Sequence, residues 1–459
     1  MELSLAEIRR ATGGEILAGT DRVCRRICID SRRVAPGDLF VAIPGERFDG
    51  HCFIPAAVAA GAVAVLASRP VEAAPGTGVI LVPDTITALG ALARCHRRRF
   101  RLPVVAVTGS IGKTSTKEMI ASIGAVRHRV AKTPGNQNNE IGLPLTLLAL
   151  EPADELLVVE MGMRGRGQIA ALASIAEPTI GVVTNIGHTH LELLGTQAAI
   201  ADAKGELLEA LPADGTAVIP ADDAFYRALS AKTKARLSSF GLSGEAGVRA
   251  ERLALHAEGS TFDVTTPRRS KYEVRLTVPG RHHVLNALAA AAVAEALGYS
   301  PEEVKTGLES YAPVGGRGSA FRTAAGWTVI DDTYNASPDS VLAALEVLKA
   351  RPAAGRKIAV LGDMLELGPA ALEGHQRVGR AAAHAGLSLL LATGDLAREF
   401  ISGAVAAGFP ATMARFYPDK NTLLADLGSL LREGDLVLVK GSRGMHLEEV
   451  VAGISGWAR

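Results

Sequence analysis

Residues 104–115 read VVAVTGSIGKTS: an apolar run enters a loop that contains two glycines and ends in Lys-Thr. This pattern predicts a strand, a phosphate-binding loop and the first turn of a helix. Gly109 and Gly112 allow backbone N–H groups to close around phosphate oxygens, and Lys113 supplies a cation to the β- and γ-phosphates. We therefore expect the chain to bind ATP through Thr108, Gly109, Ser110, Ile111, Gly112, Lys113, Thr114 and Ser115.

The loop departs from the full P-loop pattern at one position, because Val107 stands where that pattern has its first glycine. A glycine turn with a surface lysine is the alternative interpretation. The apolar strand before the loop and the Thr-Ser pair after it favour the nucleotide site. The hydroxyl of Thr114 is then a candidate ligand for Mg²⁺.

The composition describes a globular protein of about three domains, since 459 residues exceed what one core accommodates. A net charge of +1 and a hydrophobic content of 48% argue against disorder and against a nucleic-acid partner. The longest uncharged run, residues 50–68, is too mildly apolar for membrane insertion, and no signal peptide is visible. The four cysteines lack metal-ligand spacing, which is typical of reduced thiols in the cytoplasm.

Short β-branched runs alternate with Ala/Leu-rich stretches, a pattern typical of α/β folds with parallel sheets covered by helices. We predict a small α/β domain over residues 1–101 and a central nucleotide-binding domain over 102–313. The central domain carries an antiparallel addition near residues 248–278. A glycine-rich hinge at 313–318 then leads into a doubly wound, Rossmann-like sheet over 314–459.

Polar residues follow two of the predicted central strands. Glu160 ends an apolar strand, where open α/β sheets place ligands, and is a candidate Mg²⁺ ligand because a divalent ion relieves the repulsion between a carboxylate and a triphosphate. A solvated glutamate is the alternative. Residues 185–190, NIGHTH, add two imidazoles near the same edge, either as structural histidines or as ligands of a second metal ion.

Two further segments are less specific on residue chemistry alone. The loop over residues 133–142 has three asparagines within four positions, which suit either turn formation or contacts to a polar substrate. Lys204 lies in a helical stretch, where a solvated lysine is the default expectation.

Together these motifs resemble the Mur ligases, the ATP-dependent amide-forming enzymes of peptidoglycan synthesis, over essentially the whole chain. The motifs in family order are TGSIGKTS (108–115), NQNN (136–139), Glu160, NIGHTH (185–190), Lys204 and GRHHVLN (280–286). Further motifs are similar to those of the member that adds D-alanyl-D-alanine to UDP-N-acetylmuramoyl-tripeptide. They are DSR (30–32), PGDLF (36–40), DGH (49–51), DDTYNASPDS (331–340), LGDMLELG (361–368) and KGSRG (440–444).

The resemblance implies a catalytic set of Lys113, Glu160, His190 and Lys204. Thr114 and Glu160 would bind a first Mg²⁺ and His190 would lie near a second. Lys204 would carry CO₂ as a carbamate, an anion that organises the second metal ion; this chemistry needs a transiently neutral amine.

The resemblance also implies binding roles. Asn286 would approach the adenine and Arg317 the ribose or phosphates, with Asp332, Tyr334 and Asn335 reaching the nucleotide from the third domain. The substrate-binding residues implied are Ser31, Arg32, Asp49, His51, Asn136, Asn138 and Asn139, of which Ser31 and Arg32 would take the uridine diphosphate end. Ser337 departs from the family's asparagine in the third-domain motif. The enzyme would be a monomer.

The activity implied is a two-step, ADP-forming ligation through an acyl phosphate, protected from water by closure of the outer domains on the central one. Two alternatives remain. A sibling ligase that adds a single amino acid would share the central domain but not the motifs at 30–32, 49–51 and 361–368. A nucleotide-dependent switch would hydrolyse ATP without any amine and has no evident use for a third sheet.

Overall fold

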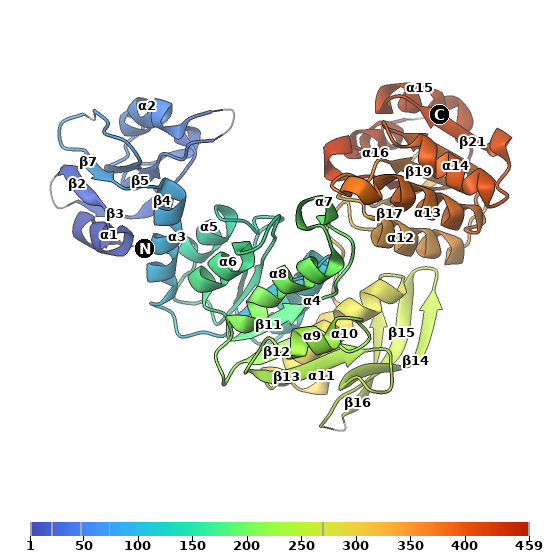
Figure 1. Cartoon of the computed structure of the whole chain (residues 1–459), viewed down its shortest axis with the longest axis horizontal. Coiled ribbons are helices and arrows are strands. Elements are labelled where there is room, and N and C mark those ends of the chain that lie inside the picture. Colours follow the sequence, from blue (N-terminus) through green and yellow to red (C-terminus); the bar gives the residue numbers. More distant parts are fainter. Residues whose placement is uncertain (1, 20–21, 46–47, 73, 269, 458–459) are drawn as a thin grey trace.

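The structure is a computed structural model that describes residues 2–19, 22–45, 48–72, 74–268 and 270–457. Three sheets follow one another along the chain, with five, nine and six strands, and a two-stranded ladder joins β1 to β3. Figure 1 shows the nine-stranded sheet between the other two. The predicted α/β class is therefore confirmed.

The first sheet has the strand order β2-β7-β6-β5-β4 and is parallel except for β2. Its helix α1 begins with a capping box, in which the Ser4 and Glu7 side chains each accept from the other's backbone N–H. The strands are β1 (Leu3–Ser4), β2 (Glu15–Ala18), β3 (Val23–Cys24), β4 (Arg26–Cys28), β5 (Asp38–Val41), β6 (Ala64–Ala67) and β7 (Gly78–Leu81). The helices are α1 (Leu5–Thr12), η1 (Ser31–Arg33), η2 (Gly50–Phe53), α2 (Ile54–Ala59) and α3 (Thr85–Arg97).

The central sheet has the order β16-β15-β14-β13-β12-β11-β8-β10-β9. Its strands are β8 (Val104–Thr108), β9 (Val130–Lys132), β10 (Leu156–Glu160), β11 (Ile180–Val183), β12 (Thr216–Pro220), β13 (Arg236–Gly241), β14 (Val248–His256), β15 (Gly259–Thr265) and β16 (Lys271–Leu276). The pairs from β9 to β14 are parallel, whereas β14, β15 and β16 pair antiparallel. The predicted antiparallel addition is thus present and extends the sheet at its edge.

Helices cover both faces of the central sheet, as the continuous apolar character of its inner strands requires. One core lies under α4, α10 and α11, and the other under α5, α6 and α8. The helices of this part are α4 (Lys113–Gly124), α5 (Gly142–Leu148), α6 (Gln168–Ala176), α7 (Leu191–Leu194), α8 (Gln197–Glu209), α9 (Tyr226–Ser230), α10 (Arg281–Ala296) and α11 (Pro301–Glu309). Strand β8 lies between β10 and β11, so the loop that follows it opens at the middle of the sheet's carboxyl edge.

The third sheet has the order β17-β18-β22-β19-β20-β21, and only β17 is antiparallel to its neighbour. Its strands are β17 (Ser319–Arg322), β18 (Thr328–Asp331), β19 (Lys357–Gly362), β20 (Leu389–Thr393), β21 (Ala414–Tyr417) and β22 (Leu436–Lys440). The helices are α12 (Pro338–Ala350), η3 (Gly368–Ala370), α13 (Ala371–Ala383), α14 (Arg398–Ala406), η4 (Ala411–Met413), α15 (Lys420–Leu430), η5 (Arg443–Met445) and α16 (Glu448–Ser455).

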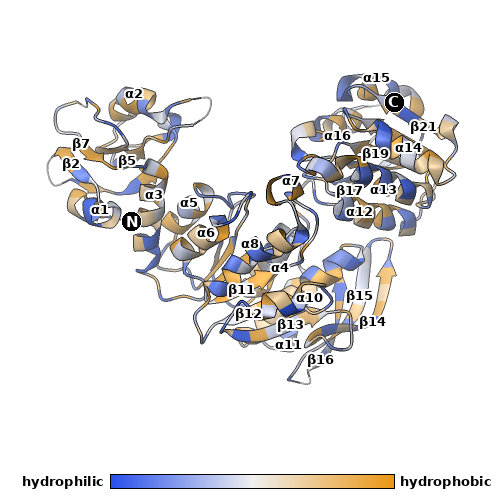
Figure 2. Cartoon of the chain, viewed as in Figure 1, coloured by the Kyte–Doolittle hydropathy of each residue, from blue (hydrophilic) through white to orange (hydrophobic). Residues whose placement is uncertain are grey.

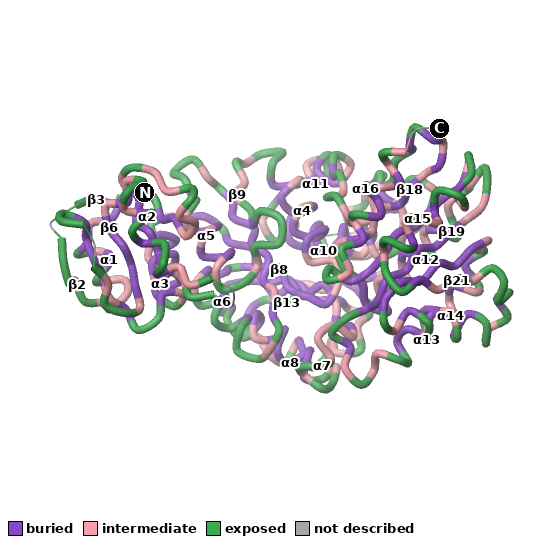
Figure 3. Tube along the Cα trace, turned by 90° about the horizontal axis from the view of Figure 1, so that it is seen from above, coloured by how far each residue is buried: buried purple, intermediate pink, exposed green. Residues whose placement is uncertain are grey.

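Hydrophobic strands form the interior of each of the three parts, and the helices alternate between apolar and polar positions (Figure 2). Buried residues lie along the strands in all three parts of the molecule (Figure 3). Among the described residues, no helix has the length and apolar character needed to cross a membrane.

Candidate active site

A cavity of about 1070 Å³ lies between the carboxyl edge of the central sheet and the third sheet. It brings together most of the predicted site residues: Ser110, Ile111, Gly112, Lys113, Thr114, Ser115, Asn136, Asn138, Asn139, Glu160, His190, Lys204, Asn286, Arg317, Asp332, Tyr334 and Asn335. Thr108, Gly109, Ser31, Arg32, Asp49 and His51 are not among its lining residues.

The glycines of the loop after β8 are required by close contacts. Gly109 has φ +147°, and a Cβ there would lie 1.8 Å from Thr184 Oγ1. Gly112 has φ +82°, and its Cβ would lie 2.3 Å from Asn286 Oδ1. Asn286, on α10, is therefore seated directly against the loop. Only glycine fits at these two positions.

Lys113 begins α4 and folds back over its own loop. Its Nζ donates to the carbonyl oxygens of Gly109, at 2.8 Å, and Ser110, at 3.2 Å. Desolvation lowers the pKa of Lys113, an effect that the charge of Glu160 opposes. Among the described residues, no carboxylate lies within 4.0 Å of Lys113 Nζ.

Glu160 is 1% exposed at the end of β10. Its Oε2 accepts a hydrogen bond of 2.6 Å from Thr114 Oγ1, and its Oε1 accepts one of 2.8 Å from Asn138 Nδ2. The adjacent hydroxyl and carboxylate oxygens are the hard donors that Mg²⁺ prefers. Within the described ranges no group of three or more His, Cys, Asp or Glu side chains could hold a metal ion, so phosphate oxygens or water would complete the coordination.

The asparagine-rich loop over residues 133–142 lines the cavity and also makes contacts within the protein. Asn138 bonds Glu160, and Asn139 Oδ1 accepts from Gly142 N at 2.9 Å, at the start of α5. The side chain of Asn136 is exposed. Of the two roles that the sequence suggests for this loop, turn formation and ligand binding, the contacts of Asn138 and Asn139 support the structural one.

Lys204 is only 2% exposed, so the default expectation of a solvated lysine is wrong. It lies on α8 and lines the cavity, and no carboxylate lies within 4.0 Å of its amine among the residues that the structure describes. Desolvation, and then the charge of Lys113, lower the pKa of Lys204 well below its usual value. Burial of this kind favours the neutral, nucleophilic form of the amine.

The two histidines of residues 185–190 both face carboxylates from the third sheet's part of the chain. His188 Nδ1 lies 3.0 Å from Asp339 Oδ2, and His190 Nδ1 lies 2.8 Å from Glu366 Oε2. The His190–Glu366 contact is close but does not have the geometry of a directed hydrogen bond. Sequence reasoning missed both partners, although Asp339 and Glu366 lie within motifs that it singled out.

Neutral imidazoles border the nucleotide side of the cavity beside Asn286. Burial, with a smaller effect of Lys440, lowers the pKa of His282 to about 4. Burial also lowers the pKa of His283 well below its usual value. Both rings are therefore uncharged near neutral pH and leave the positive charge of the site to its lysines and arginines.

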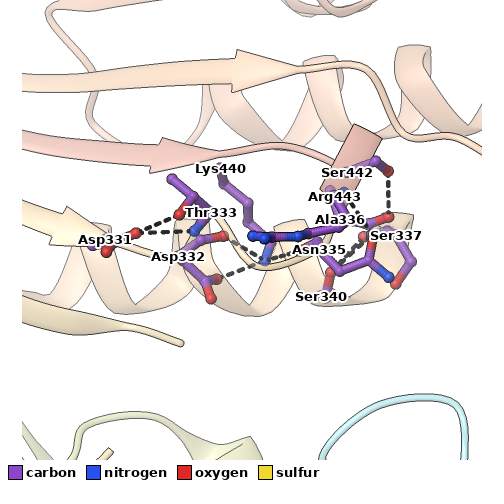
Figure 4. A network of polar contacts seen from close by, with 10 residues as sticks. All are labelled: Asp331, Asp332, Thr333, Asn335, Ala336, Ser337, Ser340, Lys440, Ser442 and Arg443. Atoms are coloured by element: carbon purple, nitrogen blue, oxygen red, sulfur yellow. Dashed lines mark hydrogen bonds and ion pairs between the residues drawn. The ribbon is translucent and has the colours of Figure 1, made fainter. Parts of the chain in front are cut away.

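The third sheet contributes a wall organised by Lys440, at the end of β22 (Figure 4). Its Nζ donates to Asp332 Oδ2 at 2.6 Å and to the Asn335 carbonyl at 2.9 Å. Ser442 Oγ donates to the Ala336 carbonyl at 3.2 Å. The guanidinium of Arg317 stacks 3.8 Å from the centre of the Tyr334 ring. Sequence reasoning quoted the KGSRG motif but gave no role to Lys440.

Replacement of Lys440 by methionine is expected to destabilise the protein by about 1–3 kcal/mol, because it leaves the partly buried Asp332 carboxylate without its ammonium partner. Burial already raises the pKa of Asp332, and loss of the ammonium would raise it further. The deficit should therefore shrink as the pH falls and Asp332 becomes protonated. Urea unfolding at several pH values measures this loss of stability. The double variant Lys440→Met/Asp332→Asn should recover stability, because it removes both charges. A double variant as unstable as Lys440→Met would contradict the pairing.

The remaining predicted substrate residues lie in the first sheet's part. Asp30 accepts from Arg32 N and pairs with the Arg32 guanidinium at 2.8 Å. His51 is buried; its Nδ1 lies 2.6 Å from Asp49 Oδ1, and its Nε2 accepts from Ser68 N at 3.0 Å. Asp49 and His51 therefore fix the local turn, whereas the Arg32 side chain is 86% exposed.

Similarity to known families covers the three parts of the chain in order. Residues 24–97 match the Mur ligase family, catalytic domain, residues 107–294 match the Mur ligase middle domain, and residues 316–443 match the Mur ligase, glutamate ligase domain. Curated relatives are named UDP-N-acetylmuramoyl-tripeptide–D-alanyl-D-alanine ligase. The relative from Synechocystis sp. is 40% identical and that from Escherichia coli 37% identical; the alignments cover 98% of this chain in both cases, and 97% and 98% of the relatives.

Solved structures agree in fold. MurF from Acinetobacter baumannii superposes with a TM-score of 0.92 at 33% identity, over 100% of this chain and 99% of that one. The MurF ligase of Thermotoga maritima in complex with ADP gives a TM-score of 0.82 at 31% identity, over 94% and 97%. Full-length identity of this level, together with the shared arrangement of all three parts, shows that the chain belongs to the Mur ligase family, as a member of the MurF type.

Proposed function

We propose that the chain is an ATP-dependent ligase that joins D-alanyl-D-alanine to UDP-N-acetylmuramoyl-tripeptide, with release of ADP and phosphate. One observation supports this function above the others: a single cavity holds the phosphate loop, the Thr114–Glu160 pair and buried Lys204 on one side, and the wall around Lys440 on the other. Relatives that carry this name cover the chain along its whole length.

The reaction proceeds in two steps. A carboxylate oxygen of the tripeptide attacks the γ-phosphorus of ATP, and the bond to ADP breaks to give an acyl phosphate. The amine of the dipeptide then attacks the acyl carbon, the bond to phosphate breaks, and the amine loses a proton. Lys113 and the N–H groups of its loop offset the repulsion between the two anions of the first step.

The residues present fit two Mg²⁺ ions. Thr114 and Glu160 would hold the first, and His190 with a modified Lys204 the second. Bound Mg²⁺ supplies charge that stabilises the transferred phosphoryl group. Glu366, which contacts His190 Nδ1, leaves Nε2 of that ring for a metal ion.

Lys204 is proposed to carry a carbamate. Its Nζ, in the neutral amine form, would attack the carbon of CO₂ and lose a proton, which gives an anionic carbamate. Burial, and then the nearby charge of Lys113, disfavour the ammonium form, and the charge of Lys113 also favours a carbamate.

Substrate roles follow the three parts, with residues 1–101 for the UDP end, 102–313 for ATP and 314–459 for the nucleotide edge and the dipeptide. Asn286 and Arg317 would contact the nucleoside, with Asp332, Tyr334 and Asn335 on the facing wall. Ser31 and the exposed side chain of Arg32 would bind the uridine diphosphate end. Since one chain supplies this whole cavity, we propose that the enzyme acts as a monomer, in the cytoplasm where ATP is available.

Phosphate release tests this function. Purified protein with ATP, Mg²⁺ and the UDP-linked tripeptide should release phosphate strongly only when D-alanyl-D-alanine is added. Single amino acids are the control: dependence on one of them would indicate a sibling ligase, and release without any amine would indicate a nucleotide-dependent switch.

A further inference from the structure

Lys117 is a fully buried lysine that the proposed reaction does not use. It lies on α4, one turn after Thr114, and its side chain is 0% exposed. Burial of an ammonium group is costly unless its donors are satisfied, so the contacts of Lys117 indicate what it stabilises.

Its partners lie in the asparagine-rich loop and on its own helix. Lys117 Nζ donates to the Thr133 carbonyl at 2.7 Å and the Gly135 carbonyl at 3.3 Å. It also lies 3.1 Å from Glu118 Oε1. Three partners suit the three donors of an ammonium group, and two of them tie the start of the loop to the helix that begins with the phosphate-binding lysine.

The same loop holds Glu160. Thr133 Oγ1 accepts from Glu160 N at 3.0 Å, and Asn138 Nδ2 donates to Glu160 Oε1 at 2.8 Å. The loop is fixed to the next turn as well, because Gly162 N donates to the Asn138 carbonyl at 2.8 Å. Lys117 Nζ itself lies 3.9 Å from Glu160 Oε2, too far for a hydrogen bond but close enough to balance its charge.

We propose that Lys117 is a positioning residue for the metal-binding carboxylate. It fixes the Thr133–Asn138 loop so that Asn138 holds one oxygen of Glu160 while the other faces Thr114. This role rests on the proposed function, in which Glu160 and Thr114 bind Mg²⁺. A simple charge pair with Glu118 does not explain the burial, because Glu118 already pairs with exposed Lys132.

The test is the affinity of Mn²⁺, as a substitute for Mg²⁺, for the protein saturated with a non-hydrolysable ATP analogue, measured by the electron paramagnetic resonance signal of free Mn²⁺. Lys117→Met is expected to weaken binding by about 10-fold or more, as loss of outer-shell partners does at other metal sites. Lys132→Met, which removes the other lysine partner of Glu118 but leaves the loop in place, should bind as the wild type does.

Wild-type Mn²⁺ affinity in a folded Lys117→Met protein would overturn the role. If that variant does not fold, Lys117→Gln takes its place; its neutral amide is one bond shorter and cannot reach both the Thr133 and the Gly135 carbonyls, so wild-type affinity in it would also overturn the role. Glu160→Gln separates the two proposals. If Glu160→Gln also binds Mn²⁺ like the wild type, the proposed metal site fails. If Glu160→Gln loses binding and Lys117→Met does not, the metal site stands and only the role of Lys117 fails.

Discussion

Lys113→Ala is expected to lower the rate of dipeptide-dependent phosphate release by about 10³-fold or more without unfolding the protein. The lysine is the cation of the phosphate loop, and groups that offset charge in phosphoryl transfer contribute effects of this size. Among the described residues, its Nζ donates only to the carbonyls of Gly109 and Ser110. Truncation therefore leaves no buried carboxylate unpaired, and the melting temperature should change little.

Initial rates of phosphate release and thermal melts measure both parts of this prediction. Lys349→Ala, at an exposed position on α12, is the control and should retain wild-type activity. A folded Lys113→Ala protein with more than a tenth of the wild-type rate would contradict the phosphate-binding assignment.

Lys204→Ala is expected to be inactive and to regain part of its activity when short carboxylates such as formate or acetate are added. Truncation leaves space where the carbamate would lie, and a small carboxylate supplies the same anionic oxygens. Folding should not suffer from loss of the charge, because the buried amine has no carboxylate within 4.0 Å in the part of the chain described.

The carbamate also predicts a pH dependence. The environment lowers the pKa of Lys204, so its amine is neutral at a lower pH than an ordinary lysine. Activity at fixed dissolved CO₂ should fall as the pH drops through that lowered pKa, because the amine becomes protonated. Lys232→Ala is the matched control and should remain active, since Lys232 pairs with Asp202 and Glu209 of α8, the helix that carries Lys204. Full activity of Lys204→Ala without added carboxylate would rule out the carbamate.

Much of the fold was accessible from sequence because local patterns determine it. The five residues Val104–Thr108 are all buried, as a central parallel strand requires, and the glycines after them have the conformations that a tight loop needs. The alternation of strands and helices likewise predicted an α/β fold with an antiparallel edge. The motifs then located most of the residues that line the cavity.

Tertiary packing explains what the sequence did not reveal. Lys204 lies in the stretch Ala-Asp-Ala-Lys-Gly-Glu, which has the composition of a solvated helix face. Its burial arises only from the packing of the folded chain around it. Similarly, Glu366 reaches His190 across 176 positions of sequence through the arrangement of the second and third sheets. No local periodicity encodes such contacts.

The short polar motifs contain both residues that make structural contacts and residues that line the cavity. Asp49 and His51, for which the family resemblance implies substrate binding, also bond each other and the Ser68 backbone. The loop Asn-Gln-Asn-Asn likewise divides its side chains between Glu160, the start of α5 and the cavity. Residue type gave the chemistry of these groups, whereas their partners depend on the folded chain.

The mass of the product tests the central claim most directly. Wild-type protein incubated with ATP, Mg²⁺, UDP-N-acetylmuramoyl-tripeptide and D-alanyl-D-alanine should convert the tripeptide nucleotide to a species heavier by the dipeptide less one water. Tandem mass spectrometry should place the addition at the end of the peptide. An unchanged nucleotide mass, with ATP consumed at the same rate whether or not the dipeptide is present, would contradict the ligase function.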